Sequence, residues 1–180
     1  MKKKNKTSIK KSKKQKKVVM VSGGFDPVHI GHVRMFNEAK KLGDELVVYL
    51  NNDNWLKKKK GFAFMPEHER KEIIEAFDAV DRVIISNHPE NPEDMSVCMG
   101  LIEIKPHIFA NGGDRDTKDS LDPKSSLYRE REIHKKLGID MIYNVGHGGK
   151  VQSSSDLVKK AKVNKKNPSS KAKLTTGRRK

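Results

Sequence analysis

The chain has 180 residues, enough for one domain with a hydrophobic core. Its formal net charge is +16, and the excess lies at the two ends: residues 1–17 hold ten lysines, residues 158–180 hold ten lysines and arginines, and neither segment has an acidic residue. Residues 18–157 are mildly acidic, with 19 basic and 23 acidic side chains. This distribution argues against a uniformly basic nucleic-acid-binding domain. No apolar run approaches the ~20 residues that span a bilayer, so no membrane partner is expected.

The terminal segments are predicted to be disordered, because a lysine-rich run has too little apolar surface to fold. We therefore expect a basic arm at residues 1–17, one domain at residues 18–162 and a basic tail at residues 163–180. The arms either keep the chain soluble or contact nucleic acid or another polyanion. The N-terminal charges are not followed by an apolar stretch, which argues against a secretory signal. A single cysteine, Cys98, suits a reducing compartment, so we expect a cytoplasmic protein.

Between the arms, short apolar runs alternate with helical patterns. In chain order we expect a strand at 18–21, a helix at 30–42, a strand at 45–50, a helix from 66, a strand at 82–85, a helix from 92, a strand at 107–110, a helix at 128–137, a strand at 141–143 and a helix from 153 to about 162. Continuous apolar strands alternating with helices are typical of a parallel sheet covered on both faces. The predicted fold is therefore α/β, a Rossmann-like, doubly wound parallel five-stranded sheet.

Ligands of such sheets bind beyond the carboxyl ends of the strands. The segment after the first strand contains glycines and histidines that suit a binding site. Gly23 and Gly24 let the backbone approach a phosphate closely. His29 and His32 are three residues apart, so both can project from one side of the first turn of a helix, and Gly31 keeps that surface open. Two imidazoles at the positive end of a helix suit an anion. A metal site is the alternative, although no cysteine or acid at ligand spacing completes it.

Residues 23–32, with the sequence GGFDPVHIGH, resemble the HxGH nucleotidyltransferase superfamily of cytidylyltransferases and adenylyltransferases. The same letters occur in class I aminoacyl-tRNA synthetases, but the chain is short for one and no KMSKS-like segment follows. Further segments resemble the glycerol-phosphate cytidylyltransferase and heptose-phosphate adenylyltransferase types. These are a lysine loop at 57–61 followed by 65–70, an entry to the third strand at 77–83, a lysine-glycine-glycine-aspartate-like ending of the fourth strand at 105–114, and a serine segment at 153–157.

The resemblance implies transfer of a nucleoside monophosphate from CTP or ATP to a small phosphorylated acceptor, with Mg²⁺ accompanying the triphosphate and pyrophosphate leaving. It also implies a possible homodimer. His29, His32 and Lys60 would be catalytic, while Lys57 and Arg70 would bind the acceptor, unless Arg70 braces the lysine loop. No side chain is assigned to a metal. The predicted nucleotide-binding residues are Gly23, Gly24, Phe25, Asp26, Gly31, Asn111, Gly112, Gly113, Asp114, Ser153, Ser154 and Ser155.

One segment departs from the cytidylyltransferase pattern. The arginine of the family's Arg-Thr-x-Gly-Ile sequence is absent from residues 146–152, so triphosphate binding would rely on His147, Lys150 or backbone donors. The strand-four ending favours the heptose-phosphate type and ATP, whereas the overall layout suits the glycerol-phosphate type and CTP equally well. A different class of function also stays open, in which the lysine-rich arms bind nucleic acid or another polyanion and the core is catalytically idle.

Overall fold

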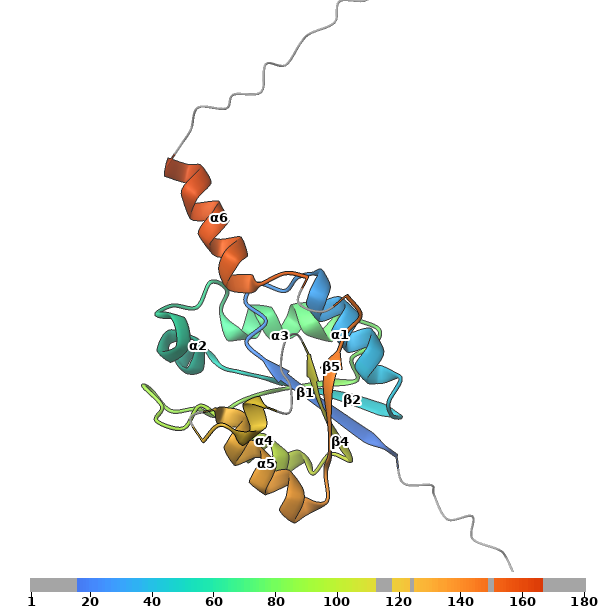
Figure 1. Ribbon diagram of the computed structural model, residues 1–180. Coiled ribbons are helices and arrows are strands. Elements are labelled where there is room, and N and C mark those ends of the chain that lie inside the picture. Colours follow the sequence, from blue (N-terminus) through green and yellow to red (C-terminus); the bar gives the residue numbers. More distant parts are fainter. Residues whose placement is uncertain (1–15, 113–117, 124, 149–150, 167–180) are drawn as a thin grey trace, which may run out of the picture.

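The sheet has five parallel strands, as the sequence predicts, and their order is β3-β2-β1-β4-β5 (Figure 1). The computed structural model describes residues 16–112, 118–123, 125–148 and 151–166. The three inner strands are mostly buried apolar runs without an alternating polar pattern, whereas the two edge strands are partly exposed. The strands are β1 (Val18–Gly23), β2 (Glu45–Leu50), β3 (Arg82–Ile85), β4 (Ile108–Gly112) and β5 (Asp140–Val145).

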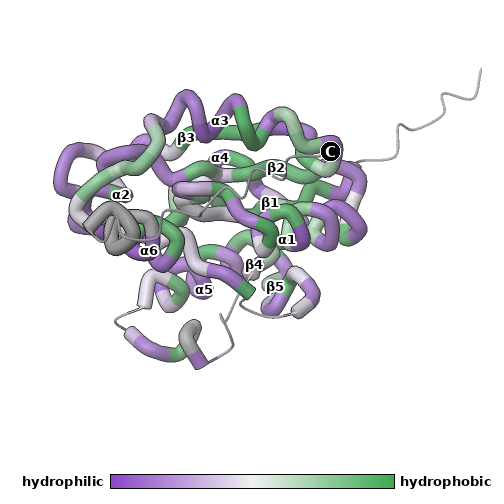
Figure 2. Tube along the Cα trace, turned by 90° about the horizontal axis from the view of Figure 1, so that it is seen from above, coloured by the Kyte–Doolittle hydropathy of each residue, from purple (hydrophilic) through white to green (hydrophobic). Residues whose placement is uncertain are grey.

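Helices cover both faces of the sheet. They are α1 (Ile30–Lys40), α2 (Asp53–Lys60), α3 (Glu67–Glu75), α4 (Cys98–Ile104), α5 (Ser126–Leu137) and α6 (Ser154–Lys166), with a 3₁₀ turn η1 at Asp119–Leu121. Helices α1 and α3 lie on one face, where Phe36 and Ile74 are buried in one core cluster, and α4 and α5 lie on the other, where Leu101 packs with Phe109 in a second (Figure 1). Figure 2 shows the hydrophobic strands between helices whose outer sides are hydrophilic.

The direction of winding changes between β1 and β4. The chain runs from β1 to β2 and β3 on one side, then crosses to β4 and β5 on the other. Doubly wound sheets bind ligands in the crevice at this point, outside the carboxyl ends of the strands. Helix α2 and the start of α6 lie at this edge (Figure 1), so the topology brings the segments after β1, β2, β4 and β5 together.

Two elements differ from the prediction. Residues 57–60, expected in a loop, form the last turn of α2, because the Asn52 side chain accepts a hydrogen bond from the backbone N–H of Trp55 and Gly61 ends the helix at a φ of 85°. Lysines are also favourable at the C-terminal end of a helix dipole. Helix α4 begins at Cys98 rather than near Pro92, since the backbone N–H of Val97 donates to the buried carboxylate of Glu130 instead of continuing a helix.

Helix α6 extends to Lys166, four residues beyond the predicted domain end at 162. Most of the predicted basic arms, at 1–17 and 163–180, lies outside the described residues. Within the described ranges, no helix combines the length and the apolar character that a membrane crossing requires.

Candidate functional site

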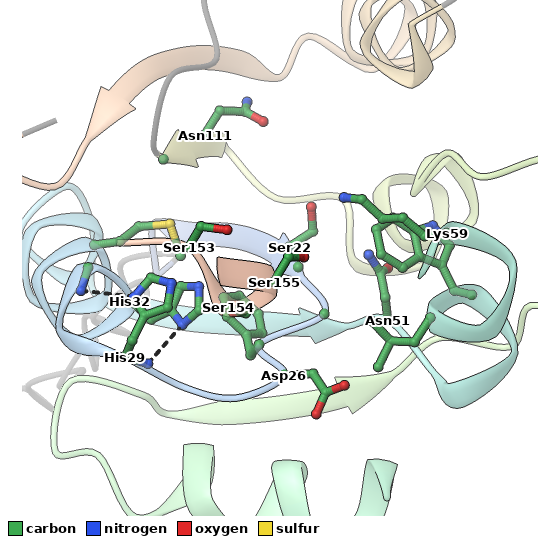
Figure 3. A pocket seen from close by; sticks show the side chains of 18 of the residues that line it. Ser22, Asp26, His29, His32, Asn51, Lys59, Asn111, Ser153, Ser154 and Ser155 are labelled. Carbon is green, nitrogen blue, oxygen red and sulfur yellow. Dashed lines mark hydrogen bonds between the residues drawn. The ribbon is translucent and has the colours of Figure 1, made fainter. Parts of the chain in front are cut away.

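A pocket of about 310 Å³ lies beyond the carboxyl edge of the sheet (Figure 3). Its walls come from the loop after β1, the end of β2, helix α2, the end of β4 and the start of α6. Every described residue of the predicted catalytic and nucleotide-binding set lines this one pocket, whereas Gly113 and Asp114 lie outside the described residues. The pocket residues from that set are Gly23, Gly24, Phe25, Asp26, His29, Gly31, His32, Lys60, Asn111, Gly112, Ser153, Ser154 and Ser155.

His29 and His32 stack on each other, with ring centroids 3.6 Å apart and an interplanar angle of 20°. The two side chains also cap helix α1. Nδ1 of His29 accepts from the backbone N–H of Gly31 at 3.2 Å, and Nδ1 of His32 accepts from the backbone N–H of His29 at 3.2 Å. Because both Nδ1 atoms accept, each neutral ring carries its proton on Nε2. The pair therefore offers two Nε2–H donors that α1 itself does not use.

Burial keeps both rings neutral. It lowers the pKa of His29, and it lowers the pKa of His32 to about 3, with a smaller contribution from the neighbouring charge of His29. Two stacked imidazoles this close would repel each other if both were protonated. The ring of Phe25 meets His32 edge-on, with centroids 4.9 Å apart, which fixes the orientation of His32. The site is thus a pair of oriented neutral donors rather than a fixed pair of cations.

This depressed pKa predicts how folding stability depends on pH. Unfolded histidine has a pKa near 6.5, so below that pH the unfolded chain binds a proton that folded His32 does not, and stability falls as pH falls toward 3. Between pH 7 and 5.5, we expect His32 to account for a loss of about 1 kcal/mol in the free energy of unfolding. Urea unfolding at both pH values, in wild type and His32→Asn, should show a flatter dependence in the variant. Equal dependence in both would contradict the burial of an uncharged ring.

A carboxylate holds the segment that follows β5. Glu38 of α1 accepts hydrogen bonds from the backbone N–H groups of Gly146 and His147, at 2.8 and 2.9 Å, and from Nδ1 of His147 at 2.8 Å. These bonds, led by the one from Gly146, lower the pKa of Glu38. His147, a candidate triphosphate contact in the sequence, is thus paired with Glu38. Further along the chain, the hydroxyl of Ser154 donates to the carbonyl of Pro27 at 2.8 Å. This bond joins the start of α6 to residues 23–32, here called the histidine loop.

The lysines of α2 divide between two surfaces. Lys60 lines the pocket but forms an ion pair with Asp26, at 2.8 Å, and also donates to the carbonyl of Asp26. Lys59 lines the same pocket, with its ammonium 4.5 Å from the centroid of the Trp55 ring. Lys57 lines a separate hollow beside Lys58, and its expected contact with the acceptor stays a prediction. The helix explains the difference, because successive residues point about 100° apart around its axis.

The carboxylate of Asp26 is also taken up within the fold. Besides the ion pair with Lys60, it accepts the backbone N–H groups of Phe64 and Met65, both at 2.7 Å. A side chain predicted to contact nucleotide therefore ties the segment after α2 to the loop after β1.

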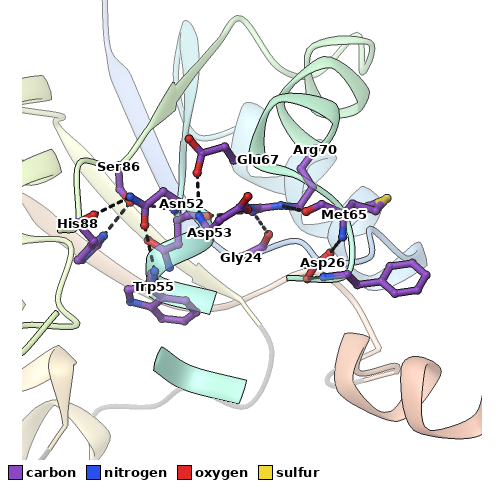
Figure 4. A network of polar contacts seen from close by, with 12 residues as sticks. Gly24, Asp26, Asn52, Asp53, Trp55, Met65, Glu67, Arg70, Ser86 and His88 are labelled. Carbon is purple, nitrogen blue, oxygen red and sulfur yellow. Dashed lines mark hydrogen bonds and ion pairs between the residues drawn. The ribbon is translucent and has the colours of Figure 1, made fainter. Parts of the chain in front are cut away.

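Arg70 is fully buried and lies outside the pocket lining, so the expected contact with the acceptor phosphate is not what the structure shows. Its guanidinium donates to the carbonyls of Gly24, Asn51 and Met65 and pairs with Asp53 at 2.6 Å (Figure 4). These contacts match the other expectation, a brace. One side chain joins the loop after β1, the end of β2 and the segment before α3.

Several pocket residues were not among the predicted site residues. Asn51 follows β2 directly, and Trp55 and Lys59 lie on α2. The rule that ligands bind at the carboxyl ends of strands applies to β2 as well as to β1, β4 and β5, and applying it there would have identified Asn51. The orientation of Trp55 and Lys59 toward the pocket could not be read from the sequence, because it depends on residues 53–60 being helical.

Comparisons with known proteins show what this chain is similar to. Residues 20–147 match the family model described as cytidylyltransferase-like. An FAD synthase of Pyrococcus horikoshii is 39% identical over 100 residues, and the bifunctional protein HldE of Aliarcobacter butzleri is 37% identical over 106 residues. The crystal structure of a lipopolysaccharide core biosynthesis protein from Thermoplasma volcanium has a TM-score of 0.58 and 28% identity, and the match covers 74% of this chain and 99% of that one.

These relatives differ in how much of them the chain spans. The match covers 54% of this chain and 64% of the FAD synthase, but 58% of this chain and 21% of the HldE protein. The part that the family model matches contains His29, His32 and the parallel sheet, because it begins at residue 20 in β1 and ends at residue 147, after β5.

Proposed function

Because this chain belongs to the cytidylyltransferase-like family, we propose that it transfers a nucleoside monophosphate from CTP or ATP to a small phosphorylated acceptor, a sugar phosphate or polyol phosphate, and releases pyrophosphate. The observation that carries the proposal is the stacked pair His29 and His32, which presents two unused Nε2–H donors in a pocket lined by Gly23 and Gly24. Such an arrangement suits the oxygens of a phosphate chain.

The proposed reaction needs no nucleophile from the protein. An oxygen of the acceptor phosphate attacks the α-phosphorus in line, a new P–O bond forms, and the bond to the β-phosphate oxygen breaks with its electron pair leaving on pyrophosphate. Positioning and charge stabilisation then carry the catalysis. His29 and His32 donate to the oxygens on which negative charge grows. Lys60, which pairs with Asp26, and Lys59 both line the pocket and add positive charge there.

Magnesium enters this proposal as part of the substrate. Among the described residues, no three side chains of His, Cys, Asp or Glu gather as a metal-binding group, and the pocket carboxylate of Asp26 is occupied by Lys60 and two backbone N–H groups. The ion would therefore be held by the phosphates and water, as is common for Mg²⁺, which dehydrates reluctantly. Ser153, Ser154 and Ser155 line the pocket at the start of α6, which supports a contact between this segment and the phosphate chain (Figure 3).

The relatives bear on the choice of nucleotide and acceptor. An FAD synthase makes an adenine dinucleotide, which favours ATP as the donor. A structural neighbour named for lipopolysaccharide core biosynthesis favours a sugar-derived acceptor. Both points concern those proteins, so CTP and a polyol phosphate stay within the proposal.

Thermal unfolding with Mg²⁺ and each of ATP, CTP, GTP and UTP tests the nucleotide site without knowledge of the acceptor. At 100 times Kd a bound triphosphate adds about 2.7 kcal/mol to stability. For a domain of this size that amounts to several degrees in Tm, at roughly 2–4 °C per kcal/mol. We expect one triphosphate to raise Tm in this way.

The matched variant is His29→Asn, which retains a residue suited to cap α1 and removes the imidazole. The shift with triphosphate should shrink in this variant, while the Tm without ligand stays close to that of the wild type. A wild type that responds to none of the four triphosphates would count against nucleotidyl transfer and would favour a role for the basic arms.

A further inference from the structure

The pocket has two sides, and they differ in chemistry. His29 and His32 lie on one side, whereas Asn51 and Lys59 lie on the other, beyond the serines at the start of α6 (Figure 3). In-line displacement places the entering and leaving oxygens on opposite sides of the phosphorus. If the triphosphate occupies the histidine and serine side, as in the proposed function, the acceptor must approach from the side of Asn51.

On this second side of the pocket, Asn51 has a side-chain oxygen without a hydrogen-bond partner among the described residues. The residue is 3% exposed and lines the pocket, yet its Oδ1 has no hydrogen-bond partner in the part of the chain that the structure describes. A buried polar atom without a partner is costly and calls for an explanation. A ligand that supplies the missing donor is one such explanation.

Two hydrogen bonds hold the backbone of Asn51, so a backbone shift that would bring its Oδ1 to another donor is disfavoured. Its N–H donates to the carbonyl of Gly23 at 2.9 Å, and its carbonyl accepts from Arg70 at 2.8 Å. The position is thus held from β1 on one side and from the buried arginine on the other. A residue held this firmly with an unused acceptor is suited to select among ligands.

Three apolar side chains line the pocket beside Asn51. Trp55 is 8% exposed, and its Nε1 donates to the carbonyl of Met95 at 2.9 Å, which ties the residues before α4 to α2. Met95 and Val97 complete this wall. Such an apolar wall suits the C–H groups of a sugar or a short polyol, while Asn51 meets a polar group at its edge.

We infer that Asn51 is a specificity-determining residue, whose Oδ1 accepts a hydrogen bond from a hydroxyl group of the phosphorylated acceptor. This inference rests on the proposed function and deepens it. A hydroxyl fits better than an ammonium group, because the Lys59 ammonium already lies over the Trp55 ring on the same wall. The carboxylate on this wall, that of Glu130, accepts the backbone N–H of Val97.

The test is the variant Asn51→Leu, which keeps the approximate size of the side chain and removes the amide. Pyrophosphate release is followed with the triphosphate identified by the thermal shift and with glycerol 3-phosphate and a set of hexose and heptose phosphates as acceptors. We expect the KM for the acceptor to rise roughly 10- to 100-fold, the effect of losing one hydrogen bond to a buried partner. The KM for the triphosphate should stay within about twofold, and the Tm should not fall.

Two controls separate recognition from structure. Asn37→Leu makes the same chemical change at an exposed position of α1 and should leave both KM values unchanged. A set of deoxy analogues of the best acceptor provides the second control. One analogue should be a poor substrate for the wild type, whereas Asn51→Leu should use that analogue and the parent acceptor equally well. The reason is that the hydroxyl and the amide are the two partners of one hydrogen bond, which is already lost in the variant.

Other outcomes would overturn the inference. A lower Tm with equal rises in both KM values would make Asn51 a structural residue. Turnover with phosphoethanolamine or phosphocholine but with no hydroxylated phosphate would make the acceptor cationic. A triphosphate shift without turnover of any hydroxylated phosphate would reject the acceptor class and leave nucleotide binding in place. The absence of both the shift and turnover would reject the proposed function itself.

Discussion

Replacing His32 by alanine should lower kcat by roughly 10²- to 10³-fold, the size typical of losing one donor that acts in the transition state. The imidazole is 3.6 Å from that of His29 between ring centroids, and its Nδ1 is engaged by the helix, so Nε2–H is the donor that the reaction would lose. Steady-state pyrophosphate release measures the effect. Because the lost interaction grows with the charge of the transition state, kcat should fall more than the KM for triphosphate changes.

His68→Ala is the matched control, since His68 is exposed on α3 and lies outside the pocket lining. It should keep kcat within about twofold of the wild type. His32→Ala also removes the acceptor for the backbone N–H of His29, so its Tm must be measured, and activity must be compared below the Tm of both proteins. An unchanged kcat in a folded His32→Ala protein would show that the histidine loop is not the catalytic site.

The sheet was predictable because several of its strands are short apolar runs and helical segments separate them along the chain. The runs at 45–50 and 82–85 match β2 and β3 residue for residue, since each is bounded by polar or glycine residues that end the strand. Parallel pairing and right-handed crossovers then predicted a doubly wound sheet, while the order of its strands comes from the structure. Helix α2 was missed because four adjacent lysines have no apolar stripe. The cap formed by Asn52 and the stop at Gly61 decide the conformation there.

The histidine loop was predictable from local spacing, whereas the second side of the pocket was not. His29 and His32 lie on one helical turn, so their proximity follows from the chain itself. Asn51 and Trp55 face the pocket only because β2 and α2 are packed beside β1, a relation between segments that local patterns do not encode. The burial of Arg70 could not be predicted from the sequence either, because an arginine in the polar first turn of a helix is usually exposed.

Replacing Arg70 by methionine should destabilise the fold by about 3 kcal/mol, within the range for breaking a buried ion pair by removing one partner. The change leaves Asp53 and the carbonyl groups of Gly24, Asn51 and Met65 without their donor. Asp53 retains some contact with solvent, at 27% side-chain exposure, which keeps the cost at the lower end of that range. Urea unfolding measures the difference in the free energy of unfolding.

Arg82→Met provides the comparison, because Arg82 and Glu45 form an exposed pair, at 3.3 Å with 50% and 22% side-chain exposure. Such pairs contribute about 0–1 kcal/mol. Arg70→Lys should recover little of the loss, since one ammonium cannot reach carbonyls on three segments as a planar guanidinium does. If Arg70 is a brace, Arg70→Met lowers stability, and any rise in the KM for acceptor accompanies that loss, because Arg70 also holds the backbone of Asn51. A large rise in that KM with unchanged stability would instead indicate that Arg70 binds the acceptor. Arg70 would then have to become accessible to the acceptor during the reaction.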